Sequence, residues 1–130
     1  MLTYTLTNMT LSVDFAAGHI TSLIIDGIER MSATTPLFRI RLRDKAGNAT
    51  HLTAYDASVR KATDHGGLFT GFPAPHKDLT VTVTLTNPAG GADWRIAVEP
   101  NTKETFAEWV DFPRVTLPDL KREPQATTIF

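Results

Sequence analysis

The chain alternates apolar and polar residues over many short stretches, which is the pattern of β-strands with one buried face. The cleanest example is residues 79–86, where four aliphatic side chains alternate with four threonines. Similar alternation predicts further strands at residues 2–6, 11–15, 20–25, 37–43, 68–72, 94–98 and 106–113. No stretch shows the period of about 3.6 residues that marks an amphipathic helix. The sequence therefore predicts an all-β protein.

Turn residues separate the predicted strands and indicate antiparallel hairpins. Asp26 and Gly27 stand between two isoleucines, and this pair suits a type I′ turn because both residue types tolerate positive φ. Residues 87–92 are expected to close a second hairpin. Residues 50–63 hold several alanines and few large apolar side chains, so the sequence leaves that segment open between short strands and a loose helical turn.

The number and spacing of the predicted strands indicate an antiparallel β-sandwich. About ten short strands at intervals of roughly eight to twelve residues are typical of sandwiches and barrels. Well-separated hairpins with cleanly alternating faces favour the sandwich. The 130 residues are enough for one domain with one core. We expect that domain to span residues 1–120, and residues 121–130 to form a tail or a truncated linker.

The stretch 106–113 is rich in aromatic residues and is expected to be the last main strand. A strict period of two divides its side chains between two faces. One face would hold Phe106, Glu108, Val110 and Phe112, and the other Ala107, Trp109 and Asp111. Both faces are partly apolar, so the face of Trp109 and Asp111 is expected to meet another domain, a partner or a ligand.

The two tryptophans have different interpretations. Trp94 continues the apolar face of its hairpin and is expected in the core. Trp109 is expected in the core or at a domain contact, and the alternative is a platform on which a sugar ring stacks.

Three arginines, Arg39, Arg41 and Arg43, share one face of the predicted strand 37–43. They would stand about 6.6 Å apart, because a strand rises about 3.3 Å per residue. Such a stripe can bind an acidic sugar or a phosphate. More often it pairs with carboxylates of neighbouring strands or is simply solvated.

Composition excludes several function classes. Thirteen basic and fourteen acidic residues give a net charge of -1, so no electrostatic footprint for nucleic acid or an anionic membrane surface is expected. Cysteine is absent, which excludes disulfides and thiol nucleophiles. The first residues lack the basic and apolar regions of a signal peptide, so a soluble chain without an export signal is expected, and its compartment stays open.

Catalytic motifs are missing from the sequence, and neither a cofactor nor a metal is expected. The four histidines have no metal-ligand spacing, and each is interpreted as a solvated or locally bonded loop residue. Glu108 and Asp111 would point to opposite faces of a regular strand, which is unsuitable for the carboxylate pair of a glycosidase. Glu108 is expected at a sheet margin or in an ion pair with a residue such as Arg95 or Arg114.

Several runs of this sequence resemble a known family. They are NMTLSVDF at residues 8–15, GHITSL at 18–23, PLFRIRL at 36–42, EWVDFP at 108–113 and LP at 117–118. Over residues 8–120 the chain is similar to the N-terminal domain of a bacterial glycoside-hydrolase-like family. In that family a β-sandwich of the galactose-mutarotase-like type, a supersandwich, precedes a catalytic (β/α)8 barrel. The EWVDFP block is the most specific of these runs.

The resemblance implies that the chain is a non-catalytic accessory domain and a fragment of a larger enzyme. It would pack on the catalytic barrel and shape the substrate entrance. The implied domain-contact or carbohydrate-binding residues are Trp109, Asp111, Arg39, Arg41 and Arg43. Two segments depart from the family pattern, Glu-Pro-Asn at residues 99–101 and the tail 121–130. The paired histidines and carboxylate of true mutarotases have no match.

Three hypotheses about function follow. The first is the accessory domain, whose partner is the catalytic domain of its parent chain. The second is a stand-alone carbohydrate-binding module. An independent epimerase is a weaker third. None of them involves nucleic acid or a membrane.

Overall fold

The structure is a computed structural model that describes residues 1–5, 8–86, 92–100 and 105–117. Within these residues the chain is built from β-strands and one short 3₁₀ helix, η1 (Ala54–Asp56). The strands are β1 (Leu2–Thr5), β2 (Met9–Asp14), β3 (His19–Ile25), β4 (Ile28–Glu29), β5 (Arg39–Asp44), β6 (Ala49–Thr53), β7 (Val59–Thr63), β8 (Gly66–Thr70), β9 (Thr80–Thr86), β10 (Asp93–Glu99) and β11 (Thr105–Asp111). The all-β prediction is confirmed.

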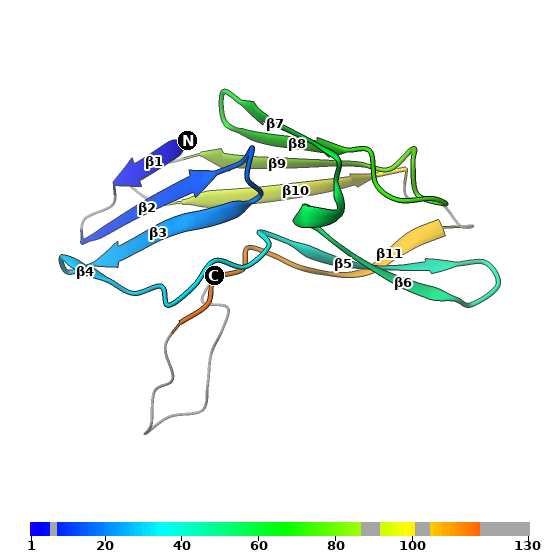
Figure 1. The fold of residues 1–130 in the computed structure, drawn as a ribbon, viewed down its shortest axis with the longest axis horizontal. Coiled ribbons are helices and arrows are strands. Elements are labelled where there is room, and N and C mark those ends of the chain that lie inside the picture. The colour runs from blue at the N-terminus through cyan, green and yellow to red at the C-terminus, as the bar shows by residue number, and fades with distance from the viewer. Residues whose placement is uncertain (6–7, 87–91, 101–104, 118–130) are drawn as a thin grey trace, which may run out of the picture.

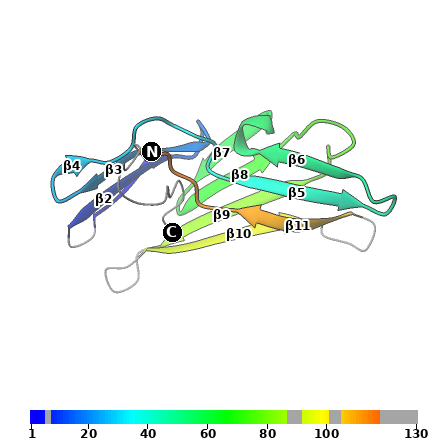
Figure 2. The ribbon, with the colours of Figure 1, turned by 90° about the horizontal axis from the view of Figure 1, so that it is seen from below.

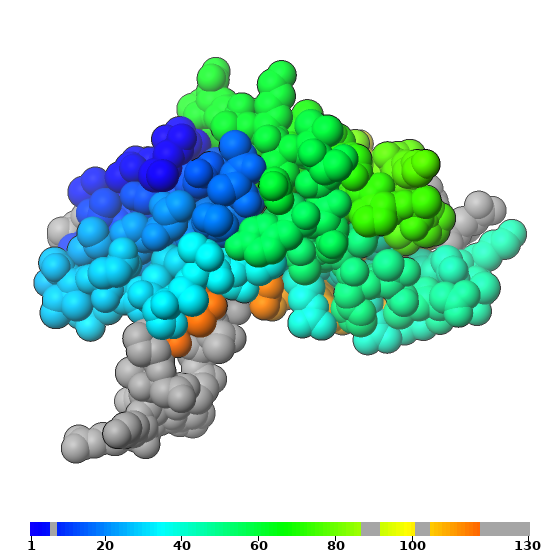
Figure 3. All heavy atoms as spheres, in the orientation of Figure 1, coloured from blue at the N-terminus to red at the C-terminus, as the bar shows by residue number. Residues whose placement is uncertain are grey.

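The strands form three antiparallel sheets. The amino-terminal sheet has the order β1-β2-β3-β4, the long sheet β10-β9-β8-β7, and the third sheet β11-β5-β6. In both ribbon views the amino-terminal sheet and the β11-β5-β6 sheet lie toward opposite ends of the long axis, and β9 and β10 run along that axis (Figures 1 and 2). The space-filling view shows the atoms around η1 between these two ends on the visible face (Figure 3).

The long sheet forms one layer, and the other two sheets together form the second. The Tyr4 hydroxyl donates to the carbonyl of Leu85 at 2.6 Å and so joins the amino-terminal sheet to the long sheet. Phe38, next to β5, packs edge-on against Phe69 of the long sheet, with ring centroids 5.0 Å apart. The inner faces of all three sheets contribute to one cluster of buried apolar residues. The expected antiparallel β-sandwich is therefore confirmed.

The clearest sequence pattern gives the clearest element. In β9, Val81, Val83 and Leu85 are buried while the threonines between them are not. Trp94 pairs with Leu85 in register and packs partly buried against the core, as expected. The type I′ turn is also confirmed, because Asp26 and Gly27 both have positive φ, 52° and 78°.

The segment 50–63 spans three short elements, which explains its weak pattern. It holds most of β6, all of η1 and then β7. A capping box begins η1: the Thr53 hydroxyl accepts a hydrogen bond from the Tyr55 amide at 3.2 Å, and Asp56 accepts one from the Thr53 amide at 2.7 Å.

Two neighbouring strands approach each other closely at Gly66 in β8. A methyl group on Gly66 would lie 1.8 Å from the carbonyl oxygen of Val83 in β9. Only glycine fits there, because any side chain would force the two strands apart.

Main-chain hydrogen bonds join the segments that flank these strands. The amide of Leu37, before β5, donates to the carbonyl of Gly18, before β3, at 2.8 Å. The amide of Arg114, after β11, donates to the carbonyl of Leu37 at 3.1 Å. The inner side chains Ile40 and Leu42 are buried in the core. These contacts hold β5 in place, so the side chains on its outer face have defined positions.

Some expectations fall outside the described residues. They are most of the turn at residues 87–92 and the whole tail 121–130, together with the last residues of the expected domain 1–120. No helix among the described residues is long and apolar enough to cross a membrane.

Candidate functional site

The five residues singled out from the sequence lie on one face of the β11-β5-β6 sheet. The strand register pairs Arg41 with Trp109 and Arg39 with Asp111, and Arg43 lies two residues further along β5. The same side of the sheet carries the residues that alternate with buried Ile40 and Leu42. We call this surface the arginine–tryptophan face and define it by Arg39, Arg41, Arg43, His51, Phe106, Glu108, Trp109 and Asp111.

A β-bulge at Glu108 corrects the predicted faces of the last strand. Ala107 pairs with Leu42 and Trp109 with the next residue, Arg41, so Glu108 is an extra residue in β11. Ala107 and Val110 therefore share the core side. The predicted grouping of Phe106 with Val110, and of Ala107 with Trp109, is wrong because it assumed an uninterrupted period of two.

The bulge brings two aromatic side chains together on the arginine–tryptophan face. Phe106 and Trp109 are both 37% exposed. Of the two expected places for Trp109, the core is therefore wrong, and a domain contact stays a prediction. If the alternation ran unbroken through Glu108, these two side chains would lie on opposite faces. Because the bulge interrupts it, the sheet presents a phenyl ring and an indole ring to the same side.

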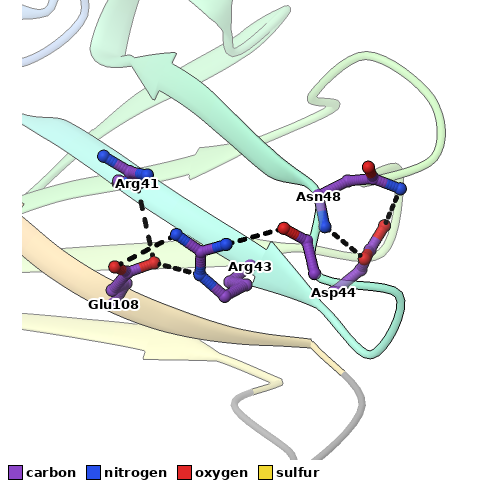
Figure 4. A network of polar contacts seen from close by, with 6 residues as sticks. Arg41, Arg43, Asp44, Asn48 and Glu108 are labelled. Carbon is purple, nitrogen blue, oxygen red and sulfur yellow. Dashed lines mark hydrogen bonds and ion pairs between the residues drawn. The ribbon is translucent and has the colours of Figure 1, made fainter.

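Glu108 lies on an edge strand and pairs with basic residues, as expected, but its partners are arginines of the neighbouring strand and not Arg95 or Arg114. Arg43 donates from Nε to Oε2 at 2.5 Å and from Nη2 to Oε1 at 3.3 Å. Arg41 Nε stands 3.6 Å from the same Oε2. Figure 4 shows both guanidinium groups reaching Glu108 from β5. The expected pairing of the arginine stripe with carboxylates of a neighbouring strand is thus confirmed for Arg43 and Arg41.

Electrostatics at this ion pair favour the charged forms of both partners. The hydrogen bonds from Arg43 hold the pKa of the Glu108 carboxyl below its ordinary value. The same contact raises the pKa of Arg43 above its ordinary value. Arg43 also donates from Nη1 to the carbonyl of Gly47 at 2.6 Å, which ties the ion pair to the β5–β6 turn.

Trp109 is surrounded by nitrogen-bearing side chains. The Arg39 guanidinium carbon lies over the indole ring, 5.5 Å from its centroid, within the range of a cation–π contact. The His51 ring lies beside it, with centroids 5.7 Å apart and planes tilted by 51°. The indole is therefore exposed, but part of its surface is already covered by Arg39.

Asp111 is partnered from its own chain segment. Its Oδ2 lies 3.2 Å from Arg114 Nε, three residues along the chain. Although the register sets Asp111 opposite Arg39, no hydrogen bond joins these two side chains in the part of the chain that the structure describes.

The structure also overturns one premise about the carboxylates. Glu108 and Asp111 both belong to the arginine–tryptophan face, because the bulge removes the alternation that would separate them. What distinguishes Glu108 from a general acid is its electrostatic setting. A general acid needs a raised pKa, whereas Arg43 lowers the pKa of Glu108.

The interpretation of the histidines as solvated or locally bonded holds for His19, and at His76 the solvated alternative is wrong. His19 is locally bonded, with Nδ1 2.9 Å from the Tyr55 hydroxyl. His76 is only 9% exposed, so it is not a solvated loop residue. It follows a proline-rich loop, and sequence alone gives no signal that this loop folds back on the core. Within the described residues no cluster of three or more candidate metal ligands forms.

His76 lines a partly open pocket of about 320 Å³ that the sequence did not reveal. Its walls come from the end of β5, the start of β6, the loop before β9, the residue after β10 and the start of β11. They include Leu42, Asp44 and Leu79. Asp44 is already used by the adjacent turn, where its Oδ1 accepts the Asn48 amide hydrogen at 2.9 Å. This hydrogen bond, the largest influence, lowers the pKa of Asp44.

Comparisons of this chain with known protein families, with curated proteins and with solved structures find no match. The resemblance to an accessory domain of a glycoside-hydrolase-like family therefore stays a prediction.

Proposed function

We propose that this chain is a non-catalytic accessory β-sandwich domain whose arginine–tryptophan face docks on a second protein domain. The resemblance names that second domain as the (β/α)8 catalytic domain of a glycoside hydrolase, where the sandwich would shape the substrate entrance. The observation that supports docking is the joint exposure of Phe106 and Trp109 on one face, next to arginines.

The composition of the face suits a protein partner. Tryptophan and arginine are the residue types most enriched among the energetically dominant contacts of protein interfaces, and phenylalanine is also enriched there. The face is built on paired strands whose opposite side is buried, so its side chains are preorganised.

The alternative is a stand-alone carbohydrate-binding module, which the exposure of Trp109 on a flat sheet face favours. A sugar platform requires an open indole face, because the ring stacks against the apolar side of a pyranose. Arg39 lies over the indole, so stacking would require this guanidinium to move. We therefore place docking before sugar binding.

Calorimetric titration distinguishes the two functions. The complete chain is titrated against the polypeptide encoded after Phe130 in its gene, and separately against a panel of glycans. Docking predicts a saturable signal with the polypeptide, which Trp109→Ala weakens by about tenfold or more, as expected for a central aromatic contact.

Ile28→Ala is the matched control, because Ile28 is an exposed apolar residue on the amino-terminal sheet. It should leave the affinity unchanged. Glycan binding that is lost in Trp109→Ala would establish the alternative instead. Absence of an open reading frame after Phe130, or of any binding to its product, would overturn the accessory-domain proposal.

A further inference from the structure

The three arginines of the arginine–tryptophan face differ in how many of their N–H groups make hydrogen bonds. Arg43 places its Nε, Nη1 and Nη2 in hydrogen bonds to Glu108 and Gly47. Arg41 makes no hydrogen bond within the described residues, and its enclosed Nε lacks a hydrogen-bond partner. Its nearest carboxylate oxygen, at 3.6 Å, already accepts the Nε hydrogen of Arg43. Arg41 is therefore ion-paired with Glu108 but makes no hydrogen bond to it, so its guanidinium can still donate to another acceptor.

Arg39 likewise makes no hydrogen bond to a carboxylate within the described residues. The carboxylate that the register sets opposite it, Asp111, bonds to Arg114 instead. Arg39 rests on the indole of Trp109 and makes no ion pair with a carboxylate in the described part of the chain. A cation–π contact supplies no hydrogen-bond acceptor, so the N–H groups of Arg39 can still donate to one.

The two arginines and one histidine are neighbours. Arg41 lies directly opposite His51 in the β5–β6 register, and the Cβ atoms of such a pair are about 5 Å apart. Arg39 is two residues from Arg41, or about 6.6 Å along the strand. Both Arg39 and His51 contact Trp109, which lies opposite Arg41 on the other side. The donors thus gather around a single indole.

We propose that Arg39, Arg41 and His51 form a receptor for one carboxylate, supplied by an aspartate or glutamate side chain of the docked domain. This inference rests on the proposed function and names the chemistry of its partner surface. The planar guanidinium presents two parallel N–H groups that match the two oxygens of a carboxylate, and such charge-assisted hydrogen bonds are among the strongest in proteins.

Charge complementarity favours a single carboxylate over a polyanion. Glu108 and Asp111 lie on the same face and flank the receptor along β11. A chain of closely spaced negative charges would be repelled by these two residues. An isolated carboxylate next to apolar side chains would meet Arg39 and Arg41, while its neighbours pack on Trp109 and Phe106.

The receptor is tested with acetate as the probe. The complete chain, labelled with ¹⁵N, is titrated with sodium acetate at pH 7, and sodium chloride keeps the ionic strength constant. We expect saturable chemical-shift changes at the side-chain N–H groups of Arg39 and Arg41 and at the His51 ring. Arg41→Gln should weaken acetate binding by about tenfold, which corresponds to the loss of one charge-assisted contact.

Arg95→Gln is the control, because Arg95 is an exposed arginine of the long sheet that pairs with Asp93. It should bind acetate like the wild type. Shifts that chloride reproduces, or that survive in Arg41→Gln, would overturn the receptor. Dispersed spectra of both variants establish that they are folded.

The source of the carboxylate is tested separately. In the docking titration Arg41→Gln should weaken binding to the downstream polypeptide by about tenfold, and Arg95→Gln should not. Undiminished docking of Arg41→Gln would refute the partner carboxylate while docking itself stands.

If docking is absent altogether, the proposed function fails, and the acetate titration still decides whether the receptor exists. Tighter binding of polygalacturonate than of acetate, lost in Arg41→Gln, would overturn the protein source in favour of an acidic polysaccharide.

Discussion

At the scale of single residues, Glu108 connects the bulge in β11 to the neighbouring strand and its turn. It is the extra residue of the bulge, and its carboxylate accepts two hydrogen bonds from Arg43. Arg43 in turn holds the carbonyl of Gly47. The bulge and the β5–β6 turn are thereby connected through side chains. Glu108, a charged residue in an aromatic strand, is thus accommodated as the unpaired residue of the bulge and held by Arg43.

Replacing Glu108 by glutamine should destabilise the fold in a pH-dependent way. The folded-state pKa of Glu108 lies below the unfolded value because Arg43 bonds to the charged form. The carboxylate therefore contributes stability above the unfolded pKa of about 4.3, and this contribution is lost as pH falls through the folded-state pKa. Urea unfolding at pH 7 and at pH 3 should show a gap between wild type and Glu108→Gln that is full at pH 7 and smaller at pH 3.

Glu99→Gln is the control for this comparison, since Glu99 makes no ion pair in the described residues. Other carboxyls with lowered pKa values, such as that of Asp44, are present in both proteins and cancel in the difference. A gap between wild type and Glu108→Gln that stays constant between pH 3 and pH 7 would contradict the ion pair as its source.

A second residue-scale prediction concerns Tyr4, whose hydroxyl joins two sheets. Its hydrogen bond to the Leu85 carbonyl is 2.6 Å long and spans 81 positions of the chain. Tyr4→Phe should lower the free energy of unfolding by about 1 kcal/mol, as measured by urea denaturation. Tyr55→Phe removes an exposed hydroxyl bonded to His19 and should change stability by less than about 0.5 kcal/mol. Equal losses in the two variants would refute the role of this hydrogen bond between the sheets.

At the scale of elements, the bulge leads to a prediction about deletions. Removing Glu108 leaves Ala107 opposite Leu42 and Trp109 opposite Arg41, which is a regular ladder with the same faces. We expect this variant to fold and to keep its β5–β11 pairing, detected as cross-strand nuclear Overhauser contacts. Removing Val110 instead would turn Asp111 toward the core, because a one-residue slip exchanges the faces of a strand. That second variant should lose several kcal/mol or fail to fold.

Elements with strong alternation could be predicted from sequence, and irregular ones could not. The pattern of residues 79–86 fixed β9 because each valine and leucine has a place in the core. The bulge at Glu108 has no compositional signal. The position of the strand 106–113 was therefore predicted correctly, but some of its side chains were assigned to the wrong face. Within the candidate site, the arginine stripe followed from alternation alone. The contacts of Arg39 and His51 with Trp109 depend on strand order, which local periodicity does not encode.

At the scale of the whole molecule, three sheets share one core. The inner residues of all three sheets belong to a single buried cluster, and Tyr4 and Phe38 link the second layer to the long sheet. Among the described residues, no sheet has a core of its own. The β11-β5-β6 sheet should therefore not unfold separately, and the arginine–tryptophan face should persist until the entire sandwich melts.

This arrangement predicts a single cooperative unfolding transition. Differential scanning calorimetry should give a calorimetric enthalpy equal to the van't Hoff enthalpy. For a chain of 130 residues the heat-capacity increment should be about 1.6–2.0 kcal/mol/K, from about 12–15 cal/mol/K per residue. Two resolved transitions, or an enthalpy ratio well above one, would show that the sheets unfold independently.

The bulge at Glu108 has one more consequence, for the behaviour of the protein at high concentration. β11 pairs with β5 on one side only and is an edge strand of its sheet. A regular edge offers an uninterrupted row of amide and carbonyl groups on which a second molecule can add a strand, and a bulge with a charged side chain interrupts that row. The variant that lacks Glu108 should therefore fold correctly and yet self-associate more readily. The same irregularity in β11 would thus protect the monomer from aggregation.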